Sequence, residues 1–115
     1  MSFKDLQDKV LSWADDKDLL HSENAEKQFM KFIEEVFEFK TEMDFYNGKS
    51  EILKSVSKKL MKDEMGDIFV TLIILCEQIG IDPVECLSMA YEKIKDRQGR
   101  TIGGNFVKAE DLIDE

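Results

Sequence analysis

The 115-residue sequence is poor in histidine, proline and cysteine, with one His, one Pro and two Cys. One histidine is too few for the HExxH zinc motif or for the Glu-x-x-His ligand pairs of di-iron bundles. A Ser-His or Cys-His nucleophile would have to use His21, which lies in a polar stretch that we expect to be an exposed loop. These scarcities exclude the common zinc and di-iron sites and argue against a histidine-activated nucleophile.

Long hydrophobic runs are also missing. The longest apolar-rich run, from Ile68 to Cys76, has nine residues, whereas a helix needs about 20 to span a bilayer. No N-terminal stretch has the apolar core of a signal peptide. Cys76 and Cys86 have no second Cys and no His at metal-ligand spacing. We therefore expect a soluble protein of the reducing cytoplasm, without a disulfide framework.

The charge balance excludes another class of partner. The chain has 16 Lys and Arg against 25 Asp and Glu, a net charge of −9. Phosphate backbones and anionic lipid surfaces would be repelled, so we expect no nucleic-acid and no membrane partner. Hydrophobic residues make up 43% of the chain, which is enough for the core of one small domain.

The spacing of turn residues predicts an all-α fold, a bundle of four helices with short connections. The expected helices run from about Phe3 to Ala14, from an N-cap at Ser22 or Asn24 to about Phe45, from about Ser50 to Ile79, and from Asp82-Pro83 to about Arg97. Asn47-Gly48 offers a left-handed turn position after the second helix. Residues 1–98 would form the helical domain. Residues 99–115 would form a turn-rich tail, in which only the piece around 101–107 resembles a strand.

Three glutamates share one sector of the second expected helix. At about 100° per residue, Glu34, Glu35 and Glu38 fall together with Lys31 beside a very wide, Phe-rich apolar arc. Taken alone, such acids are usually a solvated helix face. The apolar arc is wider than one domain needs, so part of it could bury a second subunit.

Two further acids lie on the third expected helix. Glu64 and Asp67 are three residues apart, on one face, directly before the apolar run from Ile68 to Cys76. A helix that is apolar nearly all the way round is buried, so these carboxylates lie where the helix enters the core and need a partner. Gly66 lies on the opposite side, where we expect a close helix approach.

If these two helices pack antiparallel at about 8–10 Å, the acids can face each other. Carboxylates about 4–5 Å apart repel by about 3–4 kcal/mol per pair at an effective dielectric constant near 20. Such a cluster needs cations, and oxygen ligands without His or Cys suit Mg²⁺, with Mn²⁺ as the second choice. The alternative is two solvated acidic faces that never meet.

The combined pattern is Glu34-Glu35-x-x-Glu38, a spacer of 25 residues, and Glu64-x-x-Asp67. Together with Gln28-x-x-Lys31 before it and Met65-Gly66-Asp67-Ile68 inside it, this pattern resembles the MazG-like all-α nucleoside triphosphate pyrophosphohydrolases. The resemblance covers about Trp13 to Arg97. It implies a helical, Mg²⁺-dependent enzyme that hydrolyses an NTP or dNTP to the monophosphate and pyrophosphate. It also implies a homodimer or a homotetramer.

The resemblance implies roles for single residues as well. Glu35, Glu38, Glu64 and Asp67 would hold the metal, and Glu34 would be a neighbouring catalytic acid that binds metal or positions water. The helical wheel alone does not choose between Glu34 and Glu35. Lys93 and Arg97, four apart in a basic stretch, match a phosphate-binding Lys and Arg of the family, and Lys31 supplies a further positive charge near the substrate. Many members have an Asn two residues before the Lys; Tyr91 stands there in this chain, which leaves base and sugar recognition open.

Three alternatives remain at this point. Phosphoribosyl-ATP pyrophosphohydrolases share the acidic bundle. A non-catalytic acidic helical module would bind a basic partner or only a metal ion. Lys93 and Arg97 could simply be the favourable positive charges of a helix C-terminus.

Overall fold

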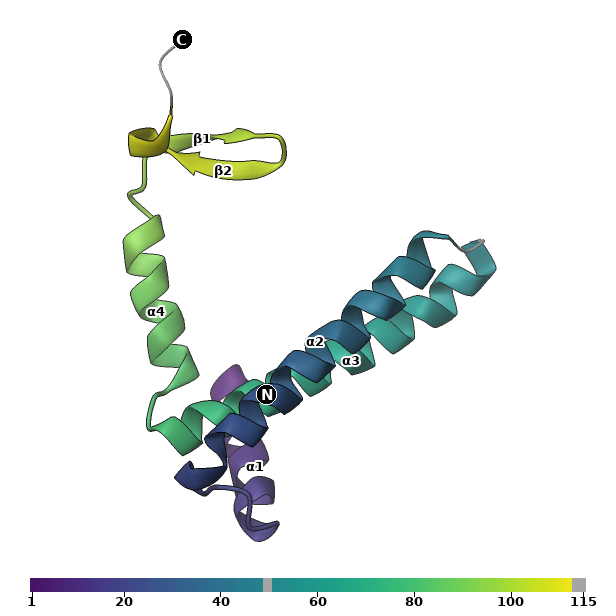
Figure 1. Cartoon of the computed structure of the whole chain (residues 1–115), viewed down its shortest axis with the longest axis vertical. Helices are drawn as coiled ribbons and strands as arrows, with labels where there is room; N and C mark the ends of the chain where they lie inside the picture. The colour runs from purple at the N-terminus through teal and green to yellow at the C-terminus, as the bar shows by residue number, and fades with distance from the viewer. Residues whose placement is uncertain (49–50, 113–115) are drawn as a thin grey trace. The chain divides into compact units, whose positions relative to one another are not determined.

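The computed structural model describes residues 1–48 and 51–112 of the chain. It is mostly helical with a small two-stranded sheet (Figure 1). The elements are α1 (Phe3–Asp16), η1 (Ser22–Asn24), α2 (Ala25–Asn47), α3 (Glu51–Ile79), α4 (Pro83–Ile94), β1 (Gly99–Ile102), β2 (Asn105–Lys108) and η2 (Ala109–Asp111). The four predicted helices are confirmed. The predicted start of the third helix at Ser50 lies outside the described residues, and α4 ends before the predicted Arg97.

The chain divides into two compact units, Met1–Pro83 and Val84–Glu115. The first contains α1, α2 and α3, and the second contains nearly all of α4, the hairpin and η2. This division falls at the start of α4. The domain boundary predicted from the sequence, between residues 98 and 99, stays a prediction. The units are therefore defined by packing and not by the change from helix to turn-rich sequence.

An antiparallel pair of long helices, α2 and α3, dominates the first unit (Figure 1). The buried apolar side chains are Ala14 of α1 and Ile73, Ile74 and Cys76 of α3. This confirms that the run before Cys76 enters the core. The expected close approach at Gly66 is wrong, because Gly66 is exposed and a Cβ there would meet no atom within 4 Å. The fully buried small residue of α3 is Ser57.

Three buried or half-buried glutamines link segments of this unit that are far apart in the sequence. Gln28 of α2 donates from Nε2 to the carbonyl oxygen of Thr71 at 3.2 Å, and Gln78 of α3 donates to the carbonyl oxygen of Leu19 at 2.8 Å. Gln7 of α1 donates to the Asp82 carboxylate at 3.2 Å. Because a buried amide loses free energy when it has no partner, these bonds favour one register of the helices.

The helix ends follow the predicted turn residues only in part. Ser2 and Asp5 form a capping box at the start of α1. Asn24 precedes α2, but its side chain makes no capping hydrogen bond. Gly48 follows α2 with a φ of −100°, so the predicted left-handed position there is wrong. Gly80, with a φ of 77°, takes that conformation after α3.

In the second unit, α4 is followed by an antiparallel hairpin in which Gly99 pairs with Lys108 and Ile102 with Asn105. Gly103 and Gly104 form its turn, with φ values of 57° and 83°, as the hairpin turn requires. A Cβ on Gly99 would lie 2.1 Å from the carbonyl oxygen of Val107. The strand-like piece predicted around 101–107 is therefore two short strands, and their close approach at Gly99 leaves no room for a side chain.

The described helices include none that is long and apolar enough to cross a membrane. Neither Cys76, which is buried, nor Cys86, which is exposed, takes part in a disulfide among the described residues.

Candidate metal centre

Three of the predicted acids converge in the first unit. Glu35 of α2 and Glu64 and Asp67 of α3 each offer a carboxylate oxygen, and these oxygens lie within 4.8 Å of one another. Glu35 is buried, with 6% of its surface exposed, Glu64 is half-buried and Asp67 is exposed. The alternative of two acidic faces that never meet is therefore wrong. We call Glu35, Glu38, Glu64 and Asp67 the acid cluster.

Two carboxylate oxygens of the acid cluster are buried without a hydrogen-bond partner among the described residues. With all the acids ionised, Glu35 Oε2 and Glu64 Oε2 have no hydrogen-bond donor in the described part of the chain. A buried carboxylate oxygen without a donor or a cation is costly. The pair therefore has the electrostatic requirement that a bound cation would meet.

Glu38 belongs to the same electrostatic group. It lies one helical turn after Glu35 on α2 and is exposed. A hydrogen bond with Glu35 raises the pKa of the Glu38 carboxyl, and the negative charge of Glu35, the loss of hydration and the charge of Glu64 act in the same direction. Glu38 thus holds a proton more readily than an ordinary glutamate, because its neighbours oppose a further negative charge.

Lys31 is the counter-ion on the same face of α2. Its Nζ lies 3.2 Å from Glu35 Oε1 and 3.9 Å from Glu34 Oε2. The hydrogen bond to Glu35, followed by the charge of Glu34, raises the pKa of Lys31. One ammonium group does not neutralise the acid cluster. Glu34 itself is exposed and points to Lys31, so the structure brings Glu35, and not Glu34, to the acids of α3.

A hydrogen bond outside the acid cluster sets its register. Gln28 lies two turns before Glu35 on α2, and Thr71 lies one turn after Asp67 on α3. The bond from Gln28 to the Thr71 carbonyl oxygen therefore fixes how far α2 slides along α3. Sequence reasoning quoted Gln28 as part of a motif but missed this role. Its helical spacing from Glu35 was the available signal, because seven residues bring a side chain back to the same face.

The donor set of the acid cluster fits a hard divalent cation. All of its ligand atoms are carboxylate oxygens, and Mg²⁺ and Mn²⁺ prefer such ligands to nitrogen or sulfur. The partly exposed side, at Asp67 and Glu38, would leave coordination positions for water or for phosphate oxygens. Three of the four predicted ligands, Glu35, Glu64 and Asp67, lie together; the full ligand set and its occupancy by a metal stay predictions.

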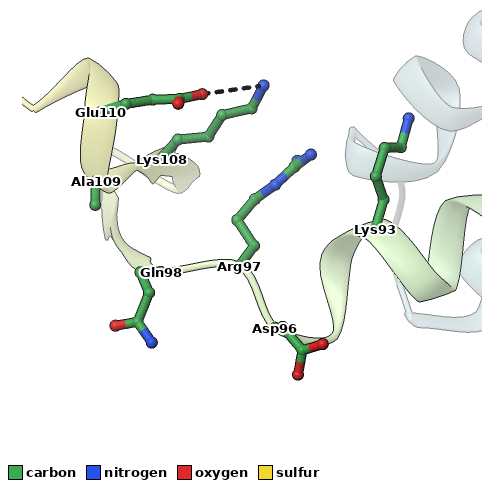
Figure 2. Close-up of a pocket in the computed structure, with 7 residues that line it drawn as sticks. All are labelled: Lys93, Asp96, Arg97, Gln98, Lys108, Ala109 and Glu110. Atoms are coloured by element: carbon green, nitrogen blue, oxygen red, sulfur yellow. Dashed lines mark ion pairs between the residues drawn. The ribbon is translucent and has the colours of Figure 1, made fainter.

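The predicted phosphate-binding residues lie in the second unit. Lys93 and Arg97 line a pocket of about 360 Å³, which we call the basic pocket (Figure 2). Its other lining residues are Asp96, Gln98, Lys108, Ala109 and Glu110. Sequence reasoning missed Lys108 because it belongs to the stretch that was interpreted as a tail. The structure brings Lys93 and Arg97 to one pocket, while the acid cluster belongs to the other unit.

Comparison with known proteins gives little further information. The chain is 32% identical over 78 residues to an uncharacterized 18.2 kDa protein of the rep-hol intergenic region of Haemophilus phage HP1. The match covers 65% of this chain and 40% of that protein, so the chain spans well under half the length of this curated relative. No family model and no solved structure matches the chain.

Proposed function

We propose that the chain is a Mg²⁺-dependent nucleoside triphosphate pyrophosphohydrolase of the MazG-like helical type. The reaction would convert an NTP or dNTP and water to the monophosphate and pyrophosphate. The observation that carries the proposal is the convergence of Glu35, Glu64 and Asp67 from two helices, with buried carboxylate oxygens that lack donors. The sequence spacing of these acids, which resembles that family, supports the same conclusion.

The roles of the acids would differ according to how deeply each side chain is buried. Glu35 and Glu64, the more buried pair, would hold the ion, and Asp67 would close the ligand set at the solvent side. A bound Mg²⁺ would supply charge for the phosphate oxygens and lower the pKa of a water molecule. Glu38 has a raised pKa and would complete the ligand set or accept a proton from the attacking water. Glu34, paired with Lys31, would support this proton transfer from the edge of the site.

The phosphate contacts are assigned to basic residues. Lys31 already pairs with Glu35 and Glu34. Its main role would be to hold these acids in place, and contact with the substrate would be its secondary role. Lys93 and Arg97 would bind the phosphates of the nucleotide, the role that the family resemblance implies. An NTP carries several negative charges and the chain carries a net charge of −9. Metal and these cations must therefore offset the repulsion.

The oligomeric state is part of the proposal. Phe29, Phe37 and Phe45 of α2 are 48%, 67% and 57% exposed. Three large aromatic side chains exposed on one helix are more than an isolated unit needs, and burial of such a surface in a homodimer or homotetramer would be favourable.

A panel of nucleotides tests the proposed reaction. The full chain is incubated with the common NTPs, the dNTPs and phosphoribosyl-ATP, with and without Mg²⁺, and the products are separated by anion exchange. Pyrophosphate and a monophosphate that form only with Mg²⁺ support the proposal. Turnover of phosphoribosyl-ATP alone would favour the related pyrophosphohydrolase instead.

Matched variants connect the reaction to the acid cluster. Glu64→Gln should abolish turnover, whereas Glu77→Gln, an exposed acid of the same helix, should not. Inorganic phosphate as the only product, or no product from any nucleotide, would contradict the proposal and leave a non-catalytic acidic module.

A further inference from the structure

Residues 93–108 form one of the basic stretches of this acidic chain. Residues 93–108 contain five of the 16 Lys and Arg and only one of the 25 Asp and Glu. The hairpin brings Lys108 back to the start of β1, because Gly99 pairs with Lys108. The backbone N–H of Ala109 also donates to the carbonyl oxygen of Gln98 at 2.8 Å. Lys108 is thereby placed beside Arg97, although 11 positions separate them in the sequence.

Three cations from three segments line the basic pocket. Lys93 comes from the last turn of α4, Arg97 from the connection to the hairpin and Lys108 from the end of β2. In Figure 2 their side chains extend to the same side, whereas the Asp96 carboxylate points to the opposite side. Arg97 and Lys108 are half-buried, so their charges are less exposed to water than those of most basic residues here.

We propose that Lys108 is a third phosphate ligand, and that Lys93, Arg97 and Lys108 together bind an oligophosphate anion in the basic pocket. The ligand class is a chain of two or three phosphates, either free or as part of a nucleotide. Three cations match the several charges of such an anion, and Arg97 can hold two oxygens at once. This inference adds a phosphate contact to the proposed function. The part that concerns a nucleotide substrate rests on the proposed function.

Glu110 acts as an internal competitor for the anion. Its carboxylate lies 3.9 Å from the Lys108 ammonium group; the Glu110 side chain is exposed, and the Lys108 side chain is half-buried. A partly exposed ion pair at this distance is weak. A phosphate group would displace the Glu110 carboxylate, because the phosphate offers Lys108 a shorter, charge-assisted hydrogen bond. Removal of the Glu110 charge should therefore strengthen anion binding.

Binding without metal tests the inference separately from turnover. Tripolyphosphate is titrated into the full chain in EDTA at low salt by calorimetry, and ATP is titrated in a parallel series. Lys108→Ala should weaken binding about tenfold, which corresponds to about 1.4 kcal/mol. Lys108→Arg should restore most of the affinity, and Glu110→Gln should raise it about two- to threefold. Lys95→Ala is the matched control, since Lys95 pairs with Glu92 at 2.6 Å and does not line the pocket.

The outcomes are distinct. Equal binding of tripolyphosphate and ATP would show that the phosphates alone are recognised, and tighter binding of ATP would show that the nucleotide is the ligand; both support the site. Equal losses of affinity in Lys95→Ala and Lys108→Ala would show that only the overall positive charge matters, and this would overturn the proposal. So would unchanged affinity in Lys108→Ala. The Mg²⁺-dependent rise in melting temperature should be the same in Lys108→Ala and the unmodified chain, whether or not either hydrolyses nucleotides.

Discussion

The acid cluster of the first unit and the basic pocket of the second unit gather charge in opposite ways. The acids come from two long helices, and their positions follow from helical spacing and from one register between α2 and α3. The cations come from a helix end, a connection and a strand. In the acid cluster Glu35 is buried and Glu64 is half-buried, whereas in the basic pocket Lys93 is exposed and Arg97 and Lys108 are half-buried. Burial decides how strongly each one needs a partner.

The difference has an energetic side. Unpaired carboxylate oxygens that are buried destabilise the folded chain until a cation binds. None of the three cations of the basic pocket is fully buried, so water and salt screen them and they cost little in the absence of an anion. We therefore expect variants of the acid cluster to change both stability and activity, and variants of the basic pocket to change mainly binding and activity.

The largest effects are expected for variants of the acid cluster, and Asp67→Asn separates turnover from stability. This change keeps the shape of the side chain but removes an anionic ligand, so turnover should fall by orders of magnitude. In the absence of metal, stability should hold or rise, since like charges within 4.8 Å repel less. Steady-state kinetics and thermal unfolding in EDTA measure the two effects. Near-normal kcat would show that Asp67 is structural and that the two-helix metal site is wrong.

The next effect concerns the basic pocket. Lys93→Ala and Arg97→Ala should lower kcat/KM by about 30- to 1000-fold, or about 2–4 kcal/mol of transition-state stabilisation. The melting temperature should barely change, because both side chains lie at a helix end or beyond it. Lys95→Ala should have little effect on either quantity. Small and equal losses at all three positions would show that the stretch is only a basic helix end.

The response to Mg²⁺ should distinguish variants of the acid cluster from variants of the basic pocket. At a hundred times its dissociation constant, one Mg²⁺ should stabilise the folded chain by about 2.7 kcal/mol if it binds only that state. Glu38→Gln should reduce this gain and abolish turnover, whereas Arg97→Ala should leave the gain intact. Calorimetric melting over a Mg²⁺ series measures it. A melting temperature that does not respond to tens of millimolar Mg²⁺ would contradict a preformed site.

The smallest effect provides a reference for an exposed pair outside both regions. His21 Nε2 lies 2.6 Å from Asp18 Oδ1, and this hydrogen bond, with the charge of Asp18, raises the pKa of His21 above 6.5. The pair should stabilise the folded chain fully below about pH 6.5. That contribution should be lost as the pH rises through the higher pKa of the folded state.

Urea unfolding at pH 5.5 and 8.5 measures this contribution against Asp18→Asn. The substitution is a clean one, since Asp18 has a φ of 61° and Asn tolerates that conformation. An equal pH dependence in both proteins would show that the pair contributes nothing.

Sequence reasoning was most successful where one helix decides the outcome. The spacing of Glu64 and Asp67 and the entry of Ile73 into the core follow from the helical repeat alone. The choice between Glu34 and Glu35 depends on how α2 is rotated against α3, which single-helix periodicity does not contain. The bond between Gln28 and Thr71, a tertiary contact across 43 residues, helps to fix it.

Backbone details and strand pairing were harder to predict. Gly48 and Gly66 were expected to serve a left-handed turn and a close helix approach, and neither does. Lys108 was missed because its neighbours follow from the pairing of two strands, and no local pattern gives that register.

The open space around Gly66 makes this residue suitable for spectroscopic labelling. It lies between Glu64 and Asp67 in the sequence and is exposed, and a Cβ there would meet no atom within 4 Å. A Gly66→Cys chain would accept a fluorophore or spin label without displacing a neighbour, once Cys86, the other exposed thiol, is replaced by Ser. Cys76 is buried and would react slowly. A paramagnetic ion such as Mn²⁺ held by the acid cluster would then quench or broaden the signal of a label only a few residues away.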